Sequence, residues 1–429
     1  MKNIKIGCLL TILFLWSCKN GDELPIVQNP AAPNILLIIA DDLGKDALRG
    51  YAEGSIKPNT PHLDALRNSG LSFNNFWSYP TCSPTRASIL TGKYGYSTGV
   101  KWATDALSTN ETTLQKYIND NTDNTYATAI VGKWHLSGNN RTFNPETMGI
   151  DYYAGLITGG VQDYFNWTFT EDGNTSTVTE YTTSKFTNLA IDWIDNQSKP
   201  WFMWLAYNAP HTPFHLPPDS MHTQGNLPPY TAGMNDMPYY MAAIEAMDFE
   251  IGRLLNSMPQ EERDNSIIIF MGDNGTPMQV AQAPYDNSNA KGTLYQGGIN
   301  VPFFVTGKGV SRTGTDDNLI TSSDLFATLS EIAGISIEQI HNSQSFKALL
   351  SQTTTIRNYQ YAEMDSGNNN SWTISNGVYK LIKNANGNEE LYNLGNDPYE
   401  QNDLLNGALN TAQMNAKAAL EAELANIRQ

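Results

Sequence analysis

Four short, largely apolar runs constrain the fold of this 429-residue chain more than any other feature. Apolar segments of six or seven residues, bounded by polar loops, are typical of parallel strands that are covered on both faces. They predict a sheet in the middle of the molecule with helices on either side. The runs cover residues 34–40, 126–131, 201–207 and 266–271.

Helical patterns separate these runs along the chain. Thr60 precedes Pro61, and Gly70 closes the segment, which is typical of a helix with a cap and a first-turn proline. Apolar residues also recur at helical spacing in three further segments, 183–194, 237–255 and 322–333. Because strands and helices alternate, the expected fold class is α/β, with a mostly parallel central sheet sandwiched by helices.

The pattern changes after about residue 340. Four short stretches joined by Asn/Gly turns, followed by a helical segment, predict a small C-terminal antiparallel sheet plus helix. The stretches are 359–364, 371–375, 378–382 and 390–392, and the helix is 411–427. We therefore expect a main domain at 34–340 and an α+β subdomain at 341–429. Residues 156–181, rich in Thr, Gly and Asn, are expected to form an insert near the active edge, where substrate selectivity often resides.

The N-terminus resembles a targeting segment. Two lysines and a short apolar run predict a signal peptide at 1–17, because the run is too short to span a bilayer comfortably. Residues 15–18 resemble a bacterial lipobox, so Cys18 is expected to carry lipid and 18–33 to form a lipid-anchored linker. The expected location is the periplasm, the outer membrane or the cell surface of a Gram-negative bacterium, with membrane contact through the anchor only. Ordinary secretion with cleavage nearby is the alternative.

Charge and cysteine content narrow the functional classes. Acidic residues outnumber basic ones by 43 to 26, which argues against nucleic acid as a partner. The chain has three cysteines, Cys8, Cys18 and Cys82. Removal of the signal and lipidation of Cys18 would leave Cys82 as the single thiol of an exported protein, with no disulfide framework. A buried, inert cysteine is the simplest alternative for Cys82.

The surroundings of Cys82 favour a reactive site. Pro84 suits the first turn of a helix, so Cys82 is expected at a helix N-terminus, where free N–H groups and the helix dipole favour an anion. Arg86 follows one turn later and can fold back towards position 82. This segment predicts an anion-binding nucleophile site.

Oxygen-bearing side chains follow two of the predicted strands. Asp41 and Asp42 come after the first run, and Asp273 and Asn274 come after the fourth. An isolated acidic pair is often a helix cap, but the carboxyl ends of parallel strands meet at one sheet edge, so we expect all four side chains together. Carboxylate and amide oxygens suit calcium or magnesium and not zinc.

These motifs together resemble the type I sulfatases, a formylglycine-dependent, arylsulfatase-like family of the alkaline phosphatase superfamily. The resemblance extends from Asn34 to about Leu405. It rests on segments 82–86, 132–136, 209–213, 273–275, 391–394 and 397–400, and on Lys291 before Gln296. Two positions depart from the family pattern, because Gln296 replaces a usual Glu and Asn300 a frequent Arg.

The resemblance implies that a maturation enzyme oxidises Cys82 to formylglycine. It also implies that 34–340 is a catalytic sulfatase domain that binds calcium, with magnesium as an alternative. The implied metal ligands are Asp41, Asp42, the modified Cys82, Asp273 and Asn274.

The resemblance further implies roles for the basic residues. A hydrated formylglycine would attack sulfur, while Lys133, His211 and Lys291 bind the sulfate oxygens and stabilise charge. His211 or Lys291 would protonate the leaving alcohol, and His135, near Arg86, would deprotonate the second hydroxyl; the two histidine roles are interchangeable on the sequence alone. The implied catalytic residues are Cys82, Arg86, His135 and His211.

The function implied is hydrolysis of sulfate esters, with a sulfated glycan or an aryl sulfate as substrate. A phosphodiester or phosphonate monoester hydrolase of the same superfamily is the nearest alternative, because it can use the same nucleophile. A surface lipoprotein that binds glycans without turnover is the alternative from another class.

Overall fold

The computed structural model describes residues 32–367 and 370–428. The predicted signal peptide at 1–17, the lipidation site Cys18 and nearly all of the predicted linker lie outside these residues, so those expectations stay predictions. Within the described part of the chain, no helix has both the length and the apolar character needed to cross a membrane.

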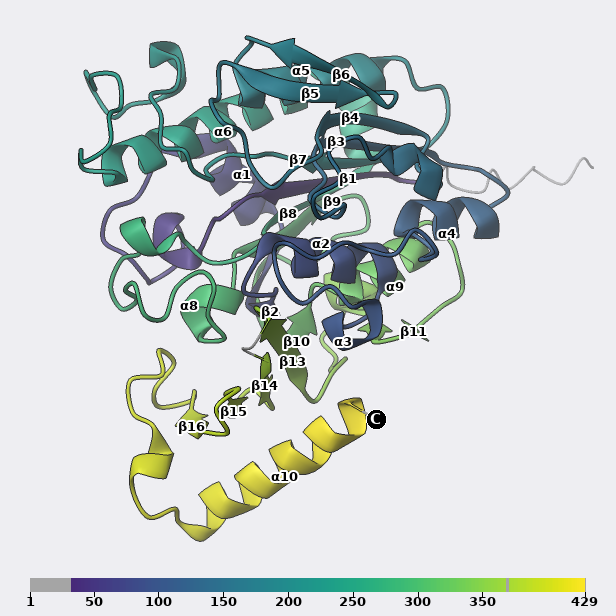
Figure 1. The fold of residues 1–429 in the computed structure, drawn as a ribbon. Coiled ribbons are helices and arrows are strands. Elements are labelled where there is room, and N and C mark those ends of the chain that lie inside the picture. The colour runs from purple at the N-terminus through teal and green to yellow at the C-terminus, as the bar shows by residue number, and fades with distance from the viewer. Residues whose placement is uncertain (1–31, 368–369, 429) are drawn as a thin grey trace, which may run out of the picture. The chain divides into compact units, whose positions relative to one another are not determined.

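A ten-stranded mixed sheet forms the centre of the fold (Figure 1). Its strand order is β10-β2-β9-β8-β1-β7-β3-β4-β5-β6. The central strand β1 (Asn34–Ala40) is buried along its whole length and pairs in parallel with β7 (Trp201–Ala206) and β8 (Ser266–Gly272). Strand β3 (Ala127–Lys133) is parallel to β7. The four apolar runs are therefore strands of one parallel core, as predicted.

The flanking strands include antiparallel pairs. Next to the core, β9 (Phe303–Gly307) runs antiparallel to both β8 and β2 (Leu71–Trp77). The remaining strands are β4 (Tyr152–Leu156), β5 (Trp167–Glu171), β6 (Asn174–Val178) and β10 (Gly314–Thr321). Of these, β4 and β10 add in parallel to β3 and β2, whereas β5 and β6 form an antiparallel edge.

Helices cover both faces of the sheet because successive strand residues point to opposite sides. Ile35, Leu37 and Ile39 belong to the core on one face, and Leu36 and Ile38 belong to the core on the other. The first core includes α2 (Cys82–Thr91), α4 (Leu114–Asn121) and α9 (Asp324–Ile332). The second core includes α1 (Pro61–Ser69), α5 (Thr182–Asp195) and α6 (Met237–Ser257). The shorter helices are α3 (Gly95–Thr98), α7 (Gln260–Asp264) and α8 (Gln296–Ile299).

A four-stranded antiparallel sheet follows, in the order β13-β14-β15-β16. Its strands are Gln360–Asp365, Asn370–Ser375, Tyr379–Lys383 and Glu389–Asn393. Helix α10 (Thr411–Ile427) packs Leu420 and Leu424 against this sheet. A two-stranded ribbon, β11 (Gln339–Ile340) with β12 (Ser343–Gln344), precedes it. The predicted antiparallel sheet plus helix is therefore present.

The second sheet is joined to the first by hydrogen bonds of buried side chains. The Gln360 amide donates to the carbonyls of Asn75 and Ile320, at 2.7 and 2.8 Å. The buried Lys380 ammonium donates to the Leu294 carbonyl, at 2.6 Å. Both sheets belong to one compact unit that begins at Ala32.

Candidate active site

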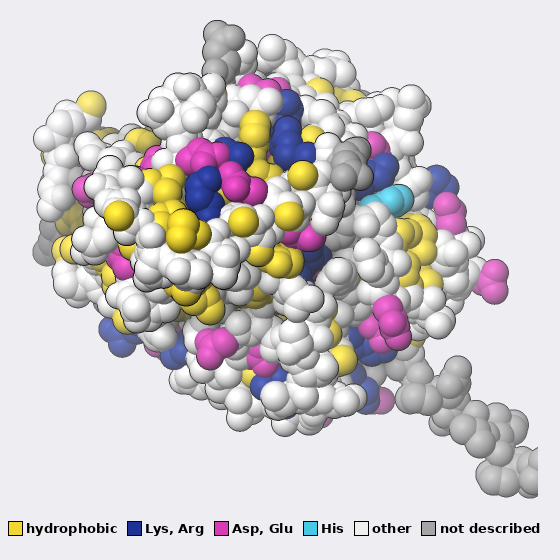
Figure 2. Space-filling view, turned by 90° about the horizontal axis from the view of Figure 1, so that it is seen from below, with side chains coloured by type: hydrophobic (Ala, Val, Ile, Leu, Met, Phe, Trp, Pro, Cys, Tyr) yellow, Lys and Arg dark blue, Asp and Glu magenta, His cyan; other side chains and the backbone are white. Residues whose placement is uncertain are grey.

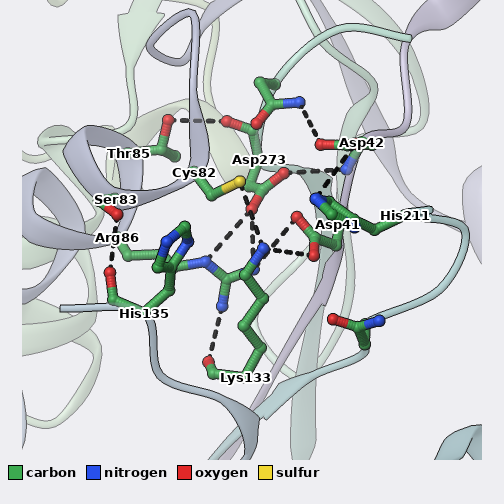
Figure 3. A network of polar contacts seen from close by, with 12 residues as sticks. Asp41, Asp42, Cys82, Ser83, Thr85, Arg86, Lys133, His135, His211 and Asp273 are labelled. Carbon is green, nitrogen blue, oxygen red and sulfur yellow. Dashed lines mark hydrogen bonds and ion pairs between the residues drawn. The ribbon is translucent and has the colours of Figure 1, made fainter. Parts of the chain in front are cut away.

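The predicted site residues converge at the carboxyl edge of the parallel strands (Figure 3). Asp41 and Asp42 follow β1, Asp273 follows β8, Lys133 ends β3, and Cys82 begins α2. Parallel strands present their carboxyl ends to one edge of the sheet, so residues more than 200 positions apart meet there.

Cys82 is held at the start of a buried helix. The preceding Thr81 is extended, and the Thr85 hydroxyl donates to the Asp273 carbonyl at 2.7 Å, which fixes the helix start against the loop after β8. The Cys82 side chain is buried, and the Lys133 ammonium donates to its sulfur at 3.3 Å. Burial raises the pKa of the Cys82 thiol, and the Asp41 carboxylate raises it further. As a free thiol, this side chain is a weak nucleophile.

Beside Cys82, acidic side chains and one histidine offer a set of metal ligands. Asp41, Asp42, Cys82 and His211 each present one ligand atom, and these atoms lie within 4.8 Å of one another. The Asp42 backbone, at φ 66°, is in the left-handed region. Its N–H donates to Asp273 Oδ1 at 3.1 Å, so the turn after β1 is tied to the loop after β8.

Two buried oxygens in this cluster fit a bound cation. Asp41 Oδ1 and Asn274 Oδ1 have no hydrogen-bond partner within the described residues, although both side chains are fully buried. The Asn274 amide nitrogen donates to Asp42 Oδ1 at 2.8 Å, which fixes the amide orientation. An unpaired buried oxygen is unfavourable unless a cation or a donor meets it, and carboxylate and amide oxygens are preferred calcium ligands. The residues present therefore fit the metal that the sequence predicted.

The buried carboxylates perturb one another. Burial raises the pKa of Asp273 to about 7, and the neighbouring Asp41 carboxylate adds to the shift. Burial alone would raise the pKa of Asp41 as well, but Lys133, His211 and Arg86 outweigh it and lower that pKa. A divalent cation among these oxygens would favour the charged form of both groups.

Three predicted sulfate-binding side chains surround the same point. The Lys133 ammonium lies 2.5 Å from Asp41 Oδ2, and the Lys291 ammonium lies 2.5 Å from Asp42 Oδ2. His211 Nε2 lies 3.7 Å from the same Asp42 oxygen. The arrangement places two ammonium groups and an imidazole around Cys82, where they can share the negative charge of a bound sulfate.

Arg86 supports the site through hydrogen bonds from its buried guanidinium. Its guanidinium is fully buried and donates twice to Asp273 Oδ2, at 2.7 and 3.2 Å. A third bond reaches the Lys133 carbonyl at 2.7 Å. Arg86 therefore positions the loop after β8 and the end of β3, and its guanidinium also lies 3.9 Å from Asp41 Oδ1.

The two predicted catalytic histidines are both partly buried but held differently. His135 has a left-handed backbone, at φ 57°, and its carbonyl accepts from the Ser83 hydroxyl at 2.7 Å. Burial lowers the pKa of His135 well below 6.5, and Lys133 and Arg86 lower it further. The neutral ring keeps Nδ1 without a partner in the described structure. This form suits the predicted role of a base.

His211 has a defined tautomer when neutral. Its Nδ1 lies 2.6 Å from the Thr212 carbonyl, which can only accept, so Nδ1 carries the hydrogen and Nε2 faces Asp42. Burial lowers the pKa of His211, while Asp42 opposes that shift. His211 can therefore exchange a proton with substrate only through Nε2.

Three residues that contact these histidines were not predicted from the sequence. A Cβ at Gly159 would lie 2.3 Å from His135 Nε2, and a Cβ at Gly160 would lie 3.2 Å from His211 Cε1. The Tyr164 hydroxyl donates to the His211 carbonyl at 2.6 Å. All three residues belong to the predicted insert 156–181, so composition indicated the segment but not the individual contacts.

Residues 33–335 match the sulfatase family model, and residues 288–429 match the model of the C-terminal region of N-sulphoglucosamine sulphohydrolase. The uncharacterized sulfatase YdeN of Escherichia coli is 29% identical over 367 residues, which cover 71% of this chain and 63% of that protein. The chain thus spans less than two thirds of this curated relative.

Other relatives are matched over more of their length. An arylsulfatase of Klebsiella aerogenes is 26% identical, with 71% of this chain and 87% of the relative covered. An ulvan-active sulfatase of Formosa agariphila is 27% identical, with 96% of this chain and 85% of the relative covered.

Solved structures share the fold. The structure of Ps i-CgsB with k-i-k-neocarrahexaose has a TM-score of 0.78 and 25% identity, and the match covers 93% of this chain and 94% of that one. The structure of BT4656 with D-glucosamine-2-N,6-O-disulfate has a TM-score of 0.78 at 21% identity, covering 92% and 98%. At that identity the second match establishes the fold alone.

Proposed function

The chain belongs to the sulfatase family, and from this premise we propose that it hydrolyses sulfate esters of a carbohydrate. The observation that carries the proposal is the convergence on Cys82 of a lysine ammonium, at 3.3 Å, and a cluster of buried carboxylates. Formylglycine at position 82, once hydrated, supplies a hydroxyl nucleophile for sulfur. Asp41, Asp42, Asp273 and Asn274 would hold calcium, which when bound would supply positive charge to lower the pKa of that hydroxyl.

The chain's own residues bind the sulfate and stabilise its charge. Lys133 and Lys291 reach the site from different elements, one from the end of β3 and one from the loop before α8. Their ammonium groups are held by Asp41 and Asp42, so they are oriented before substrate arrives. Preorganised donors of this kind stabilise charge that develops in the transition state.

Protons move through the two histidines. Burial lowers the pKa of His211. Burial also acts to lower the pKa of Lys291, but Asp42, Cys82 and Asp41 together outweigh it and raise that pKa, so a protonated His211 gives up its proton more readily. We assign His211 Nε2 to protonation of the leaving alcohol. The neutral His135 is assigned to removal of the proton that regenerates the aldehyde at position 82.

A sulfated carbohydrate is the proposed substrate class. The support comes from relatives whose names state such activity, the ulvan-active sulfatase and the Ps i-CgsB structure with a bound carrageenan oligosaccharide. Acidic and basic side chains are interspersed on the face drawn in Figure 2, without a broad basic surface of the kind that a nucleic acid would need. We further propose export and lipid anchoring through Cys18, which a Cys18→Ser variant tests by moving the protein from membrane to soluble fractions.

Mass spectrometry of the tryptic peptide 68–86 from the native host tests the nucleophile. We expect the mass of an aldehyde at position 82 and turnover of an aryl sulfate well above that of the matching aryl phosphate. Cys82→Ala, prepared in the same way, is the control and should turn over neither ester. An unmodified thiol in an active preparation would contradict the formylglycine proposal, and faster turnover of the phosphate would contradict the sulfatase proposal.

A further inference from the structure

A polar cavity of about 390 Å³ lies outside the candidate active site. Its wall combines residues after β1 and in β2 with residues of α8 and of the C-terminal region. None of the metal-ligand or sulfate-binding candidates lines it. We propose that this cavity is a second, non-catalytic binding site for uncharged carbohydrate, which takes hexose units through their hydroxyl groups.

A buried amide forms part of the cavity wall. Gln296 is 4% exposed, and its backbone N–H is bonded to Glu400 Oε2, at 2.5 Å, so the residue is anchored. Its Oε1 accepts no hydrogen bond within the described residues and is closed to solvent, so a ligand hydroxyl would reach this acceptor only after the amide turns towards the cavity. A buried acceptor without a donor is unfavourable, which favours such a turn once a donor is present.

The neighbouring polar groups are held in place before any ligand arrives. The buried Lys45 ammonium donates to the Asn74 carbonyl, at 2.6 Å, and to Asn300 Oδ1, at 2.7 Å. The Asn300 amide nitrogen donates to the same Asn74 carbonyl, at 3.1 Å. Fixed donors and acceptors lose little conformational entropy on binding, which favours a small polar ligand.

The charges of the wall favour a neutral ligand over sulfate or a carboxylate. Glu53 lines the same cavity as Lys45, so an anion that approached the ammonium would also meet a carboxylate. Burial lowers the pKa of Lys45 to about 8, which weakens its pull on anions in mildly alkaline solution. Side-chain amides both donate and accept, as sugar hydroxyls do, and Asn75, Gln296 and Asn300 provide three of them.

Aromatic rings complete a wall suited to sugars. Tyr399 is partly exposed and lines the cavity, and its ring meets that of Tyr285 edge-on, with centroids 6.0 Å apart. A tyrosine ring offers an apolar face for the C–H groups of a sugar and a hydroxyl at its end.

Two uncharged amides, Gln296 and Asn300, line this cavity. A carboxylate at 296 would add repulsion beside Glu400, and a guanidinium at 300 would meet the Lys45 ammonium. Uncharged amides at both positions keep the wall polar without a strong field.

A second cavity of about 730 Å³ lies beside the first, and Asn75 and Gly377 line both. We call the two adjacent cavities the groove. Together they offer room for several linked sugar units, which is the form in which a polymeric substrate would present them.

Binding of an unsulfated galactan hexasaccharide to the full-length protein tests the proposal. We expect saturable binding by isothermal titration calorimetry. Tyr399→Ala should weaken binding about tenfold, since loss of one stacked ring is worth roughly a factor of ten. Asn75→Ala is the second variant, in case Tyr399→Ala fails to fold, and Lys308→Ala, outside the groove, is the matched control. Neither groove variant should change turnover of an aryl sulfate.

Three outcomes would overturn the proposal. They are absence of saturable binding to the wild-type protein, equal binding by wild-type protein and both groove variants, and loss of binding in His211→Ala with the groove intact. Displacement of the hexasaccharide by sodium sulfate would identify an anion site instead and would also overturn it. Because the probe carries no sulfate ester, failure of the proposed hydrolysis would leave this readout unchanged.

Discussion

Two buried arginine–aspartate pairs in this molecule differ in how completely the carboxylate oxygens around them are hydrogen-bonded. Arg357 and Asp324 join the segment before β13 to α9, and each Asp324 oxygen accepts from at least one backbone N–H as well as from the guanidinium. Arg86 and Asp273 lie in the candidate active site, beside Asp41 Oδ1, which accepts no hydrogen bond in the described structure. A fully satisfied pair holds elements together, whereas a cluster with free oxygens has capacity left for a ligand.

The largest expected difference is between the effects of Asp41→Asn on turnover and of Asp324→Asn on stability. Asp41→Asn should reduce kcat/KM for an aryl sulfate roughly 10³-fold, because it removes a metal ligand and the partner of Lys133. Asp324→Asn should leave turnover per folded molecule unchanged. It should instead lower the free energy of unfolding by about 3–5 kcal/mol, because Arg357 stays buried without its charge partner.

Steady-state kinetics and urea unfolding of both variants measure this contrast. Asp120→Asn, at an exposed ion pair, is the control and should change neither quantity appreciably. Equal loss of turnover in Asp41→Asn and Asp324→Asn would show that the two pairs do not differ in kind.

Removal of the metal should affect the candidate active site and not the Arg357–Asp324 pair. Dialysis against a calcium chelator should abolish turnover and lower the midpoint of thermal unfolding, and added calcium should restore both. At calcium concentrations 100-fold above Kd, binding adds about 2.7 kcal/mol to the stability of the folded protein. Asp41→Asn should lose this calcium-dependent shift, and Asp324→Asn should keep it. A midpoint that is insensitive to calcium in the wild-type protein would contradict the metal site.

A methyl group at Gly159 should produce a smaller effect. The added Cβ would approach His135 Nε2 to 2.3 Å, so the ring must move, and kcat should fall roughly 10- to 100-fold. Gly407→Ala is the matched control, since its Cβ would meet only the Leu404 carbonyl, at 4.0 Å. Unchanged kcat in Gly159→Ala would show that the position of His135 is not set by this contact.

The smallest expected effect is the pH dependence of the neutral histidine. Burial lowers the pKa of His135, and a bound cation would act in the same direction, so the ring stays deprotonated through neutral pH. We expect kcat/KM to fall with decreasing pH only below 6.5, as His135 takes up a proton. The pH–rate profile of His135→Gln should lack this acidic limb, and a limb above pH 7 that disappears in this variant would contradict the assignment.

The sequence predicted the centre of the fold better than its edges. The bounds of β1 and α10 agree with the predicted 34–40 and 411–427, because a continuous apolar run and a capped helix are local signals. The antiparallel β9, inserted between β8 and β2, was not foreseen. Its pairing with β2 depends on contacts between residues more than 230 positions apart, such as Leu71 with Val305.

The candidate site likewise contains residues that a local sequence signal predicts and contacts that no local signal predicts. Asp41, Cys82 and Lys133 were predicted to lie together, because each ends or follows a strand or begins a helix within a short recognisable segment. The support of His211 by Tyr164 has no such local signal, because it arises only when the insert folds over the loop after β7. The sequence also placed Arg86 near position 82, whereas its donors reach Asp273 and the Lys133 carbonyl.

The last residue of β3 makes activity depend on how two strands align. Lys133 points to Asp41 only while Gly132 lies opposite Ala206 of β7. Side chains alternate along a strand, so a slip of one residue would turn the ammonium group to the other side of the sheet. The close approach at Gly132, where a Cβ would lie 2.0 Å from the Ala206 carbonyl oxygen, leaves no room for a larger residue to take its place in a shifted pairing. The Lys133 ammonium group therefore lies beside Asp41 only when β3 and β7 are paired in the correct register.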